Sequence, residues 1–112
     1  MRTYKLYQLK KGDENHYHRF VGLDMLKSDG LKVEFNRYNK MYEGILFPGE
    51  TLESLFVKFN MDRPDDFSGW SMSVSDVVVI TEDGKAKAFY CDSYGFTEVP
   101  EFLNDKKRKH KE

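Results

Sequence analysis

The residues best suited to chemistry lie in one stretch, Trp70 to Phe96. Ser71, Ser73 and Ser75 alternate ahead of Asp76, and alternate side chains of an extended segment share one face. A nucleophilic serine, however, needs a base within hydrogen-bonding distance and a donor for the oxyanion. The sequence has no Gly-x-Ser-x-Gly elbow and no histidine in the fifty residues before Ser71. We therefore expect these hydroxyls and Asp76 to bond to backbone groups where the chain enters a buried strand.

Histidine and cysteine give little support for a metal site or another catalytic centre. His16 and His18 would point to the same side of a strand, but a metal ion needs further ligands, and Asp24 and His110 stand at no recognisable spacing. Cys91 lies in an apolar run, which is typical of a small buried hydrophobic residue. No glycine-rich phosphate loop of the G-x-x-x-x-G-K-S/T or G-x-G-x-x-G type occurs. We expect no catalytic residue, no metal, no cofactor and no small-molecule substrate.

The pattern of apolar residues and turn signals around these residues predicts an α+β fold in a single small domain. An antiparallel sheet with a central hairpin at about 76–91 is expected to pack against one main helix at about 51–60, with short helices besides. The hairpin prediction rests on the four β-branched residues 77–80 and on Asp83-Gly84, a step that favours a tight turn. Residues 77–80 are apolar on both strand faces, so this strand should be covered on both sides or lie inside a barrel.

Helix-capping residues, hydrophobic periodicity and helix-breaking residues predict the main helix and the shorter elements. Thr51 can cap the helix, and Glu53 places a negative charge in its first turn. Four apolar residues then form one stripe along it: Leu52, Leu55, Phe56 and Phe59. Alternating patterns predict extended pieces at 3–9, 16–20, 31–36, 42–47 and 97–99. Short helical turns are expected at 23–26, before the glycine stop at Gly30, and at 100–103.

Composition and charge set further limits. The 112 residues, 39% of them hydrophobic, suffice for one globular domain. No apolar run approaches the roughly 20 residues of a membrane span, and a lone cysteine fits a reduced compartment, so we expect a cytoplasmic protein without membrane contact. The net charge of −1 is uneven, because residues 104–112 carry five cations against two carboxylates, a net of +3, which leaves −4 for residues 1–103. We therefore expect a folded domain at 1–103 and a basic, flexible tail at 104–112.

Several short motifs of the chain are shared with a known family. They are Phe59-Asn60, Pro64 with Asp66-Phe67, Gly-Trp-Ser-Met-Ser-Val-Ser-Asp-Val-Val at 69–78, and Tyr-Cys-Asp-Ser-Tyr-Gly-Phe at 90–96. With them the chain resembles YodL-like domains, small bacterial domains found alone or within larger proteins of conjugative elements, plasmids and phages. The resemblance extends from about Tyr4 to Leu103, and Trp70 and Cys91 depart from the residues expected at those positions. It implies a non-enzymatic accessory or regulatory role, with no catalytic residue to carry over.

Two functional hypotheses follow, with an enzyme as a distant third. The first is a protein-interaction module that binds, and inhibits or regulates, an unidentified host or mobile-element protein. Its candidate contact or motif residues are Trp70, Ser73, Ser75, Asp76, Asp92, Tyr94 and Phe96. The alternative is a nucleic-acid-associated accessory factor that contacts nucleic acid, or an acidic partner, only through the tail residues Lys106, Lys107, Arg108, Lys109 and Lys111. An enzyme would require Ser73, Ser75, Asp76 or Asp92 to converge in a concave pocket.

Overall fold

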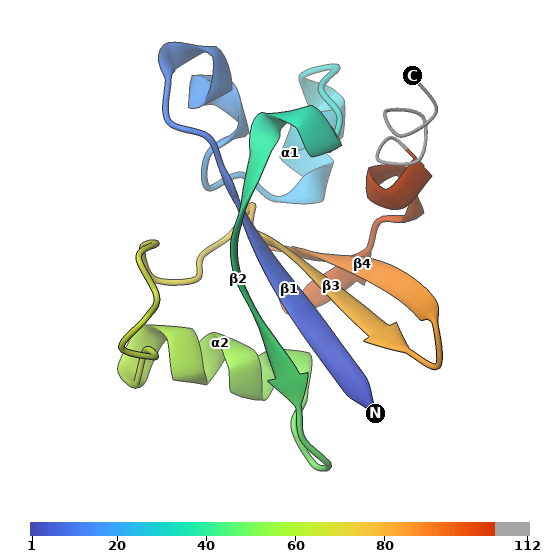
Figure 1. The fold of residues 1–112 in the computed structure, drawn as a ribbon. Helices are drawn as coiled ribbons and strands as arrows, with labels where there is room; N and C mark the ends of the chain where they lie inside the picture. Colours follow the sequence, from blue (N-terminus) through green and yellow to red (C-terminus); the bar gives the residue numbers. More distant parts are fainter. Residues whose placement is uncertain (105–112) are drawn as a thin grey trace.

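A five-stranded antiparallel sheet forms the centre of the computed structural model, which describes residues 1–104 (Figure 1). Its strands are β1 (Arg2–Leu9), β2 (Tyr38–Leu46), β3 (Val77–Glu82), β4 (Lys85–Cys91) and β5 (Phe96–Glu98). They lie in the order β2-β1-β3-β4-β5, and all four neighbouring pairs are antiparallel. The predicted α+β fold with an antiparallel sheet is confirmed.

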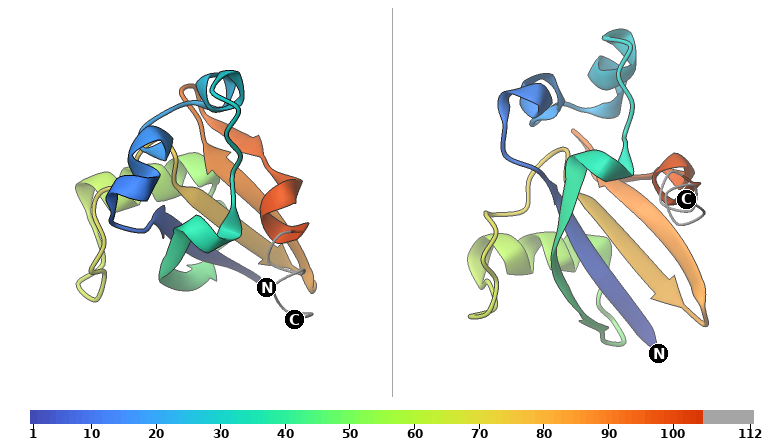
Figure 2. Two further views of the ribbon diagram at one scale, coloured as in Figure 1. Left: turned by 90° about the horizontal axis from the view of Figure 1, so that it is seen from above. Right: turned by 45° about the horizontal axis from the view of Figure 1, so that its top comes forward.

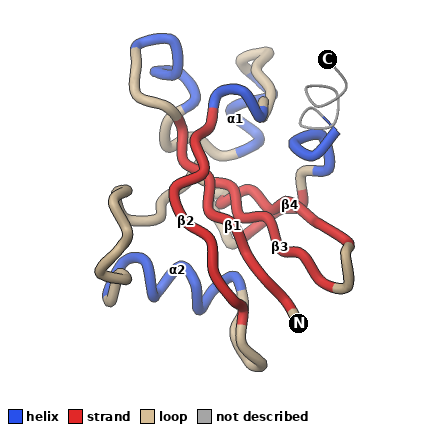
Figure 3. Tube along the Cα trace, in the orientation of Figure 1, coloured by secondary structure: helices blue, strands red, loops and turns tan. Residues whose placement is uncertain are grey.

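Helices cover the sheet on both sides. They are the α-helices α1 (Leu23–Ser28) and α2 (Leu52–Met61), the 3₁₀ helices η1 (Asp13–His18) and η2 (Phe35–Arg37), and a helical segment at 100–104. Figure 2 shows α2 set apart from α1 and from the C-terminal helical segment, with the sheet between them. The long connection from α2 to β3, residues 62–76, is loop throughout (Figure 3). None of the described helices is long and apolar enough to cross a membrane.

The central strand β3 separates two hydrophobic cores. Val77 and Val79 pack into one core with Phe102 and the α1 leucines, whereas Val78 packs into the other with Leu55 and Phe59 of α2. Alternate residues of a strand point to opposite faces, so an uninterrupted valine run supplies both cores at once. The prediction that this strand is covered on both sides is confirmed.

The β3–β4 hairpin closes through the predicted turn. Glu82 pairs with Lys85, which leaves the two-residue loop Asp83-Gly84. Both residues have positive φ, 53° and 77°, as the tightest hairpin turns require. Glycine adopts this region without steric cost, and aspartate tolerates it better than most side chains. The hairpin follows directly from local turn chemistry.

Two predicted extended pieces are wrong. Residues 16–20 fall largely within the 3₁₀ helix η1, and residues 31–36 form loop and the start of η2. Apolar alternation at 31–36 has a different cause, since Val33 is buried in the first core without a strand neighbour. Strand β2 begins at Tyr38, four residues before the predicted start, because there it meets Leu9 of β1. A strand requires a partner for its backbone, and side-chain alternation alone does not supply one.

Helix α2 begins with a reciprocal cap. The Ser54 N–H donates to the Thr51 Oγ1 at 3.1 Å, and the Thr51 N–H donates to the Ser54 Oγ at 2.8 Å. We expect Thr51→Ala to lower the free energy of unfolding by about 1 kcal/mol, because the Ser54 N–H loses the Thr51 Oγ1 as its acceptor. Urea unfolding measures this loss of stability, with Lys32→Ala, a change at an exposed loop position, as the control. A loss no larger than that of the control would show that the cap contributes nothing.

Candidate functional site

A buried hydrogen-bonded pair lies beneath the Ser-x-Ser-Asp motif. Asp76 is 2% exposed just before β3, and Gln8 of β1 is fully buried. The Gln8 Nε2 donates to the Asp76 Oδ2 at 3.0 Å and to the Trp70 carbonyl oxygen at 2.9 Å. The Ser73 N–H donates to the same carboxylate oxygen at 3.1 Å. Burial raises the pKa of Asp76 to about 7 although both hydrogen bonds lower it, because desolvation disfavours the charged form.

Ser75 joins three separate parts of the chain. Its N–H donates to the Cys91 carbonyl at 2.9 Å, and its own carbonyl accepts from the Tyr38 hydroxyl at 2.7 Å. Its Oγ accepts a hydrogen bond from the Phe20 N–H at 3.3 Å. The backbone of Ser75 has φ 90°, in the left-handed region that favours glycine. Ser75 therefore joins the segment after η1, strand β2 and strand β4 to the start of β3, which is the structural role that we expected.

Asp92 organises the corner between β4 and β5. Its Oδ1 accepts from the Leu23 N–H at 3.0 Å and the Ser93 N–H at 2.8 Å, and its Oδ2 accepts from the Thr97 hydroxyl at 3.0 Å. Partial burial opposes ionisation, but these three donors outweigh it and hold the pKa of Asp92 below its ordinary value. Gly22 allows this contact, since a Cβ there would lie 2.3 Å from the Ser93 Oγ.

Removing the Asp92 carboxylate should loosen the attachment of α1. We expect Asp92→Ala to lower the free energy of unfolding at neutral pH by about 2 kcal/mol, because three donors lose a charged acceptor. The contribution of the carboxylate is lost as pH falls through its depressed pKa, so wild type and variant should converge in acid. Urea unfolding measures the difference, with the exposed turn residue Asp65→Ala as control. Equal stability of the two variants at neutral pH would contradict this role.

The aromatic residues of the motif region lie on two different surfaces. Tyr94 is 97% exposed at the tip of the corner, and Phe96 is half-buried against the second core. Trp70 and Ser73 instead line a separate cavity together with Phe20, and neither Tyr94 nor Phe96 lines it. A single patch containing Trp70, Tyr94 and Phe96 is therefore not what the structure shows.

A groove lies between α2 and the 91–96 corner, and we call it the α2–β5 groove. It encloses about 320 Å³, with Glu53, Phe56 and Val57 on the helix side and Val74 with residues of the corner on the other. Phe56 is 37% and Val57 57% exposed. The sequence predicts one apolar stripe that contains Leu55, Phe56 and Phe59, but the structure divides it: α2 turns Leu55 and Phe59 into the core and leaves Phe56 partly exposed at the groove.

Carboxylates mark the polar side of this groove. Glu53 and Asp92 line it, and no Lys, Arg or His of the described chain does. Cys91 also lines it, but burial raises the pKa of its thiol to about 12, so it stays neutral and unreactive. The surface thus combines apolar side chains with negative charge.

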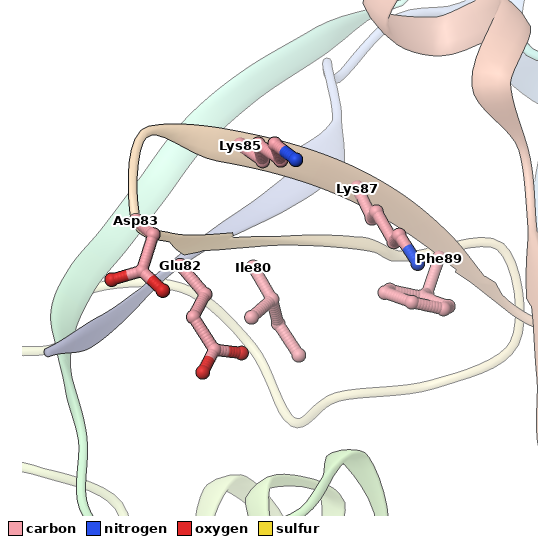
Figure 4. Close-up of a pocket in the computed structure, with 6 residues that line it drawn as sticks. All are labelled: Ile80, Glu82, Asp83, Lys85, Lys87 and Phe89. Atoms are coloured by element: carbon pink, nitrogen blue, oxygen red, sulfur yellow. The ribbon is translucent and has the colours of Figure 1, made fainter.

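The same side of the sheet continues along the hairpin. A second hollow of about 410 Å³ is lined by Ile80, Glu82, Asp83, Lys85, Lys87 and Phe89 (Figure 4). Phe89 and Cys91 alternate with Tyr90 on β4 and so point to the face that α2 occupies. The hairpin therefore adds two lysines and two carboxylates beyond the acidic groove.

Other candidate residues bring no chemistry together. His16 is exposed, and His18 is buried, where desolvation lowers the pKa of its imidazole. Within residues 1–104 no group of three or more potential ligands could hold a metal ion. The tail cations 106–109 and 111 lie outside the described residues, so their role stays a prediction.

Comparison with known proteins gives one match. A model of the family described as YodL-like domain matches residues 3–102, which include the buried pair, the Asp92 corner and the groove. No curated protein and no solved structure matches the chain. The chain belongs to the family of YodL-like domains.

Proposed function

We propose that this domain is a non-catalytic protein-binding module whose α2–β5 groove receives a basic, apolar segment of another protein. The partner would be a protein of a bacterial host or mobile element that this binding inhibits or otherwise regulates in the cytoplasm. One observation carries the proposal: Phe56 and Val57 of α2 line the groove with apolar surface that the described chain leaves exposed.

Two apolar side chains of α2 are exposed at the groove. Phe56 and Val57 are 37% and 57% exposed, and they line the groove together with the half-buried Phe96. Contiguous exposed apolar side chains commonly mark interaction surfaces. A groove between a helix and a sheet suits an amphipathic partner segment, whose apolar side chains would fill it.

Charge selects among partner segments. Glu53 and Asp92 border the apolar residues, and the donors around Asp92 keep it ionised at neutral pH. A cationic segment would pair with these carboxylates, whereas an acidic one would be repelled. This charge complementarity is the reason why we propose a basic, apolar segment as the ligand of the groove.

The motif side chains support a binding role over catalysis. The side chains of Asp76, Asp92 and Ser75 accept hydrogen bonds from backbone and side-chain donors of the domain itself. None of the hydrogen bonds that these side chains form has a histidine, the usual catalytic base, as its partner. Their arrangement stabilises the corner and the strand entry that form one wall of the groove.

A defined peptide pair tests the proposal. We would titrate the isotope-labelled chain with an amphipathic Leu/Lys peptide of about 18 residues and with its Leu/Glu counterpart, and follow amide shifts by NMR. The cationic peptide should shift the amide resonances of residues around Val57, Val74 and Phe96, and the acidic peptide should leave these resonances unchanged. Equal responses to both peptides, or shifts confined to other surfaces, would contradict the proposal.

Two matched variants locate the binding site. Val57→Lys places a cation on the groove, and Met25→Lys makes the same change at a position of equal exposure, 56% against 57%, on α1. We expect the first to weaken binding of the Leu/Lys peptide at least about tenfold and the second to leave it unchanged. Both positions are exposed, so neither change removes core packing.

A further inference from the structure

A further cavity, separate from the α2–β5 groove, is formed in part by the 69–76 segment. It is an open hollow of about 510 Å³ lined by Lys11, Arg19, Phe20, Trp70, Ser71 and Ser73. It shares no lining residue with the groove. Its walls combine two cations, two aromatic rings and two hydroxyl groups, a set of side chains that the protein-binding proposal does not use.

The cations of this cavity have no counter-ion. Neither Arg19 nor Lys11 forms an ion pair with any residue of the described part of the chain. Arg19 is nevertheless held in place, since its Nη2 donates to the carbonyls of Lys10 at 2.7 Å and Gly12 at 3.4 Å. A guanidinium has five N–H donors, so a positioned arginine without a carboxylate retains donors for an anion.

The aromatic side of the cavity is built on constrained backbone. Phe20 has φ 59° and is 65% exposed. The Phe20 N–H donates to the Oγ of Ser75, which also has positive φ. The backbone of Trp70 is held in place, because its carbonyl accepts from the buried Gln8 side chain at 2.9 Å. Strained non-glycine residues of this kind cluster at functional sites.

We propose that this cavity binds a nucleotide, with the base against Phe20 and Trp70 and the phosphate held by Lys11 and Arg19. Aromatic side chains stack on bases of any sequence, and arginine binds phosphate through paired N–H donors. An apolar ligand would leave two cations unpaired, and an inorganic anion would leave both rings uncovered. The volume suits a ligand of this size. The nucleotide can be free or can be the end of a nucleic-acid strand, and binding here is a function beyond that of the groove.

Trp70 is the only tryptophan of the chain and reports on the cavity directly. We would titrate the full chain with each of the common nucleoside monophosphates up to about 5 mM, and in parallel with adenosine, with inorganic phosphate, and with a 5′-phosphorylated oligonucleotide of about six residues. At least one nucleoside monophosphate should quench Trp70 fluorescence. The concentration that it requires should be at least about tenfold lower than the concentration of adenosine alone or phosphate alone that gives the same quenching. Tighter binding of the oligonucleotide would identify a strand end as the source, and equal or weaker binding a free nucleotide.

Matched lysine variants keep the test decisive. Lys11→Gln should weaken nucleotide binding about five- to tenfold without changing the unfolding midpoint, and Lys32→Gln, an exposed lysine outside the cavity, should not. Phe20→Gly removes a ring while relieving the positive φ, and should also weaken binding. The proposal is overturned by the absence of any fluorescence change, by equal effects of the two lysine variants, or by tighter binding of a phosphotyrosine peptide than of every nucleotide.

Discussion

Replacing Asp76 by asparagine is expected to abolish most of the loss of stability that the wild-type domain undergoes as pH rises from about 4 to about 7. Burial raises the pKa of this carboxyl from 3.8 to about 7, so the folded state binds its proton more tightly than the unfolded state. The stability linked to that proton is fully present below the unfolded pKa and is lost as pH rises through the folded pKa. Three pH units correspond to a loss of about 4 kcal/mol.

The measurement compares urea unfolding of wild type and Asp76→Asn from about pH 4 to pH 8. Wild-type stability should fall across this range relative to the variant, which has no carboxyl to ionise. Asp92 acts in the opposite direction, because its pKa is depressed, but it is present in both proteins and cancels in the difference. Asp65→Asn, in an exposed turn, serves as the control. Parallel curves for wild type and Asp76→Asn would show that Asp76 does not titrate in this range.

Replacing Gln8 by leucine is expected to be the most destabilising polar substitution at neutral pH. Gln8 is the only side chain of the described residues that donates to Asp76, and without it the buried carboxyl lies beside an apolar group and its pKa rises further. Leaving a buried hydrogen-bonding group without its partner typically costs about 1–3 kcal/mol, and more when the group is charged. The loss should shrink at about pH 4, where Asp76 is protonated.

A double-mutant cycle separates this effect from lost packing. Gln8→Leu, Asp76→Leu and the double variant should give an interaction energy of at least about 1 kcal/mol, with the double variant more stable than the sum of the single changes predicts. Replacing both members of a buried polar pair by apolar residues is often close to neutral. Additive changes would show that the 3.0 Å contact contributes nothing specific.

Much of the fold could be predicted where local chemistry decides. The β-branched run of β3, the Asp83-Gly84 turn and the Thr51 cap each determine an element by themselves, and the structure contains all three. The errors fall where a distant partner decides. The alternation at 31–36 predicts a strand, but this segment has no neighbour in the sheet and its apolar side chains pack from a loop instead.

The binding surfaces were harder to predict for the same reason. Periodicity assigned Phe56 and Phe59 to one stripe of the helix, and only the position of α2 on the sheet determines which of them is covered. Gln8 could have been noticed, because Tyr4, Leu6 and Gln8 share one strand face and that face is buried. The positive φ of Phe20 has no signal in the sequence, so the cavity beside Trp70 could not be foreseen.

Cross-linking in bacterial cells tests the proposed function most directly. A photo-reactive benzoylphenylalanine would replace Val57 in the groove or, in the control, Met25 on α1, which is equally exposed. We expect a cross-link from position 57 to a basic, apolar segment of one partner protein. This cross-link should be absent from position 25 and should be lost when Phe56 is changed to serine. Equal cross-linking from both positions, or a cross-link from position 57 to a segment that is acidic or lacks apolar residues, would contradict the proposed function.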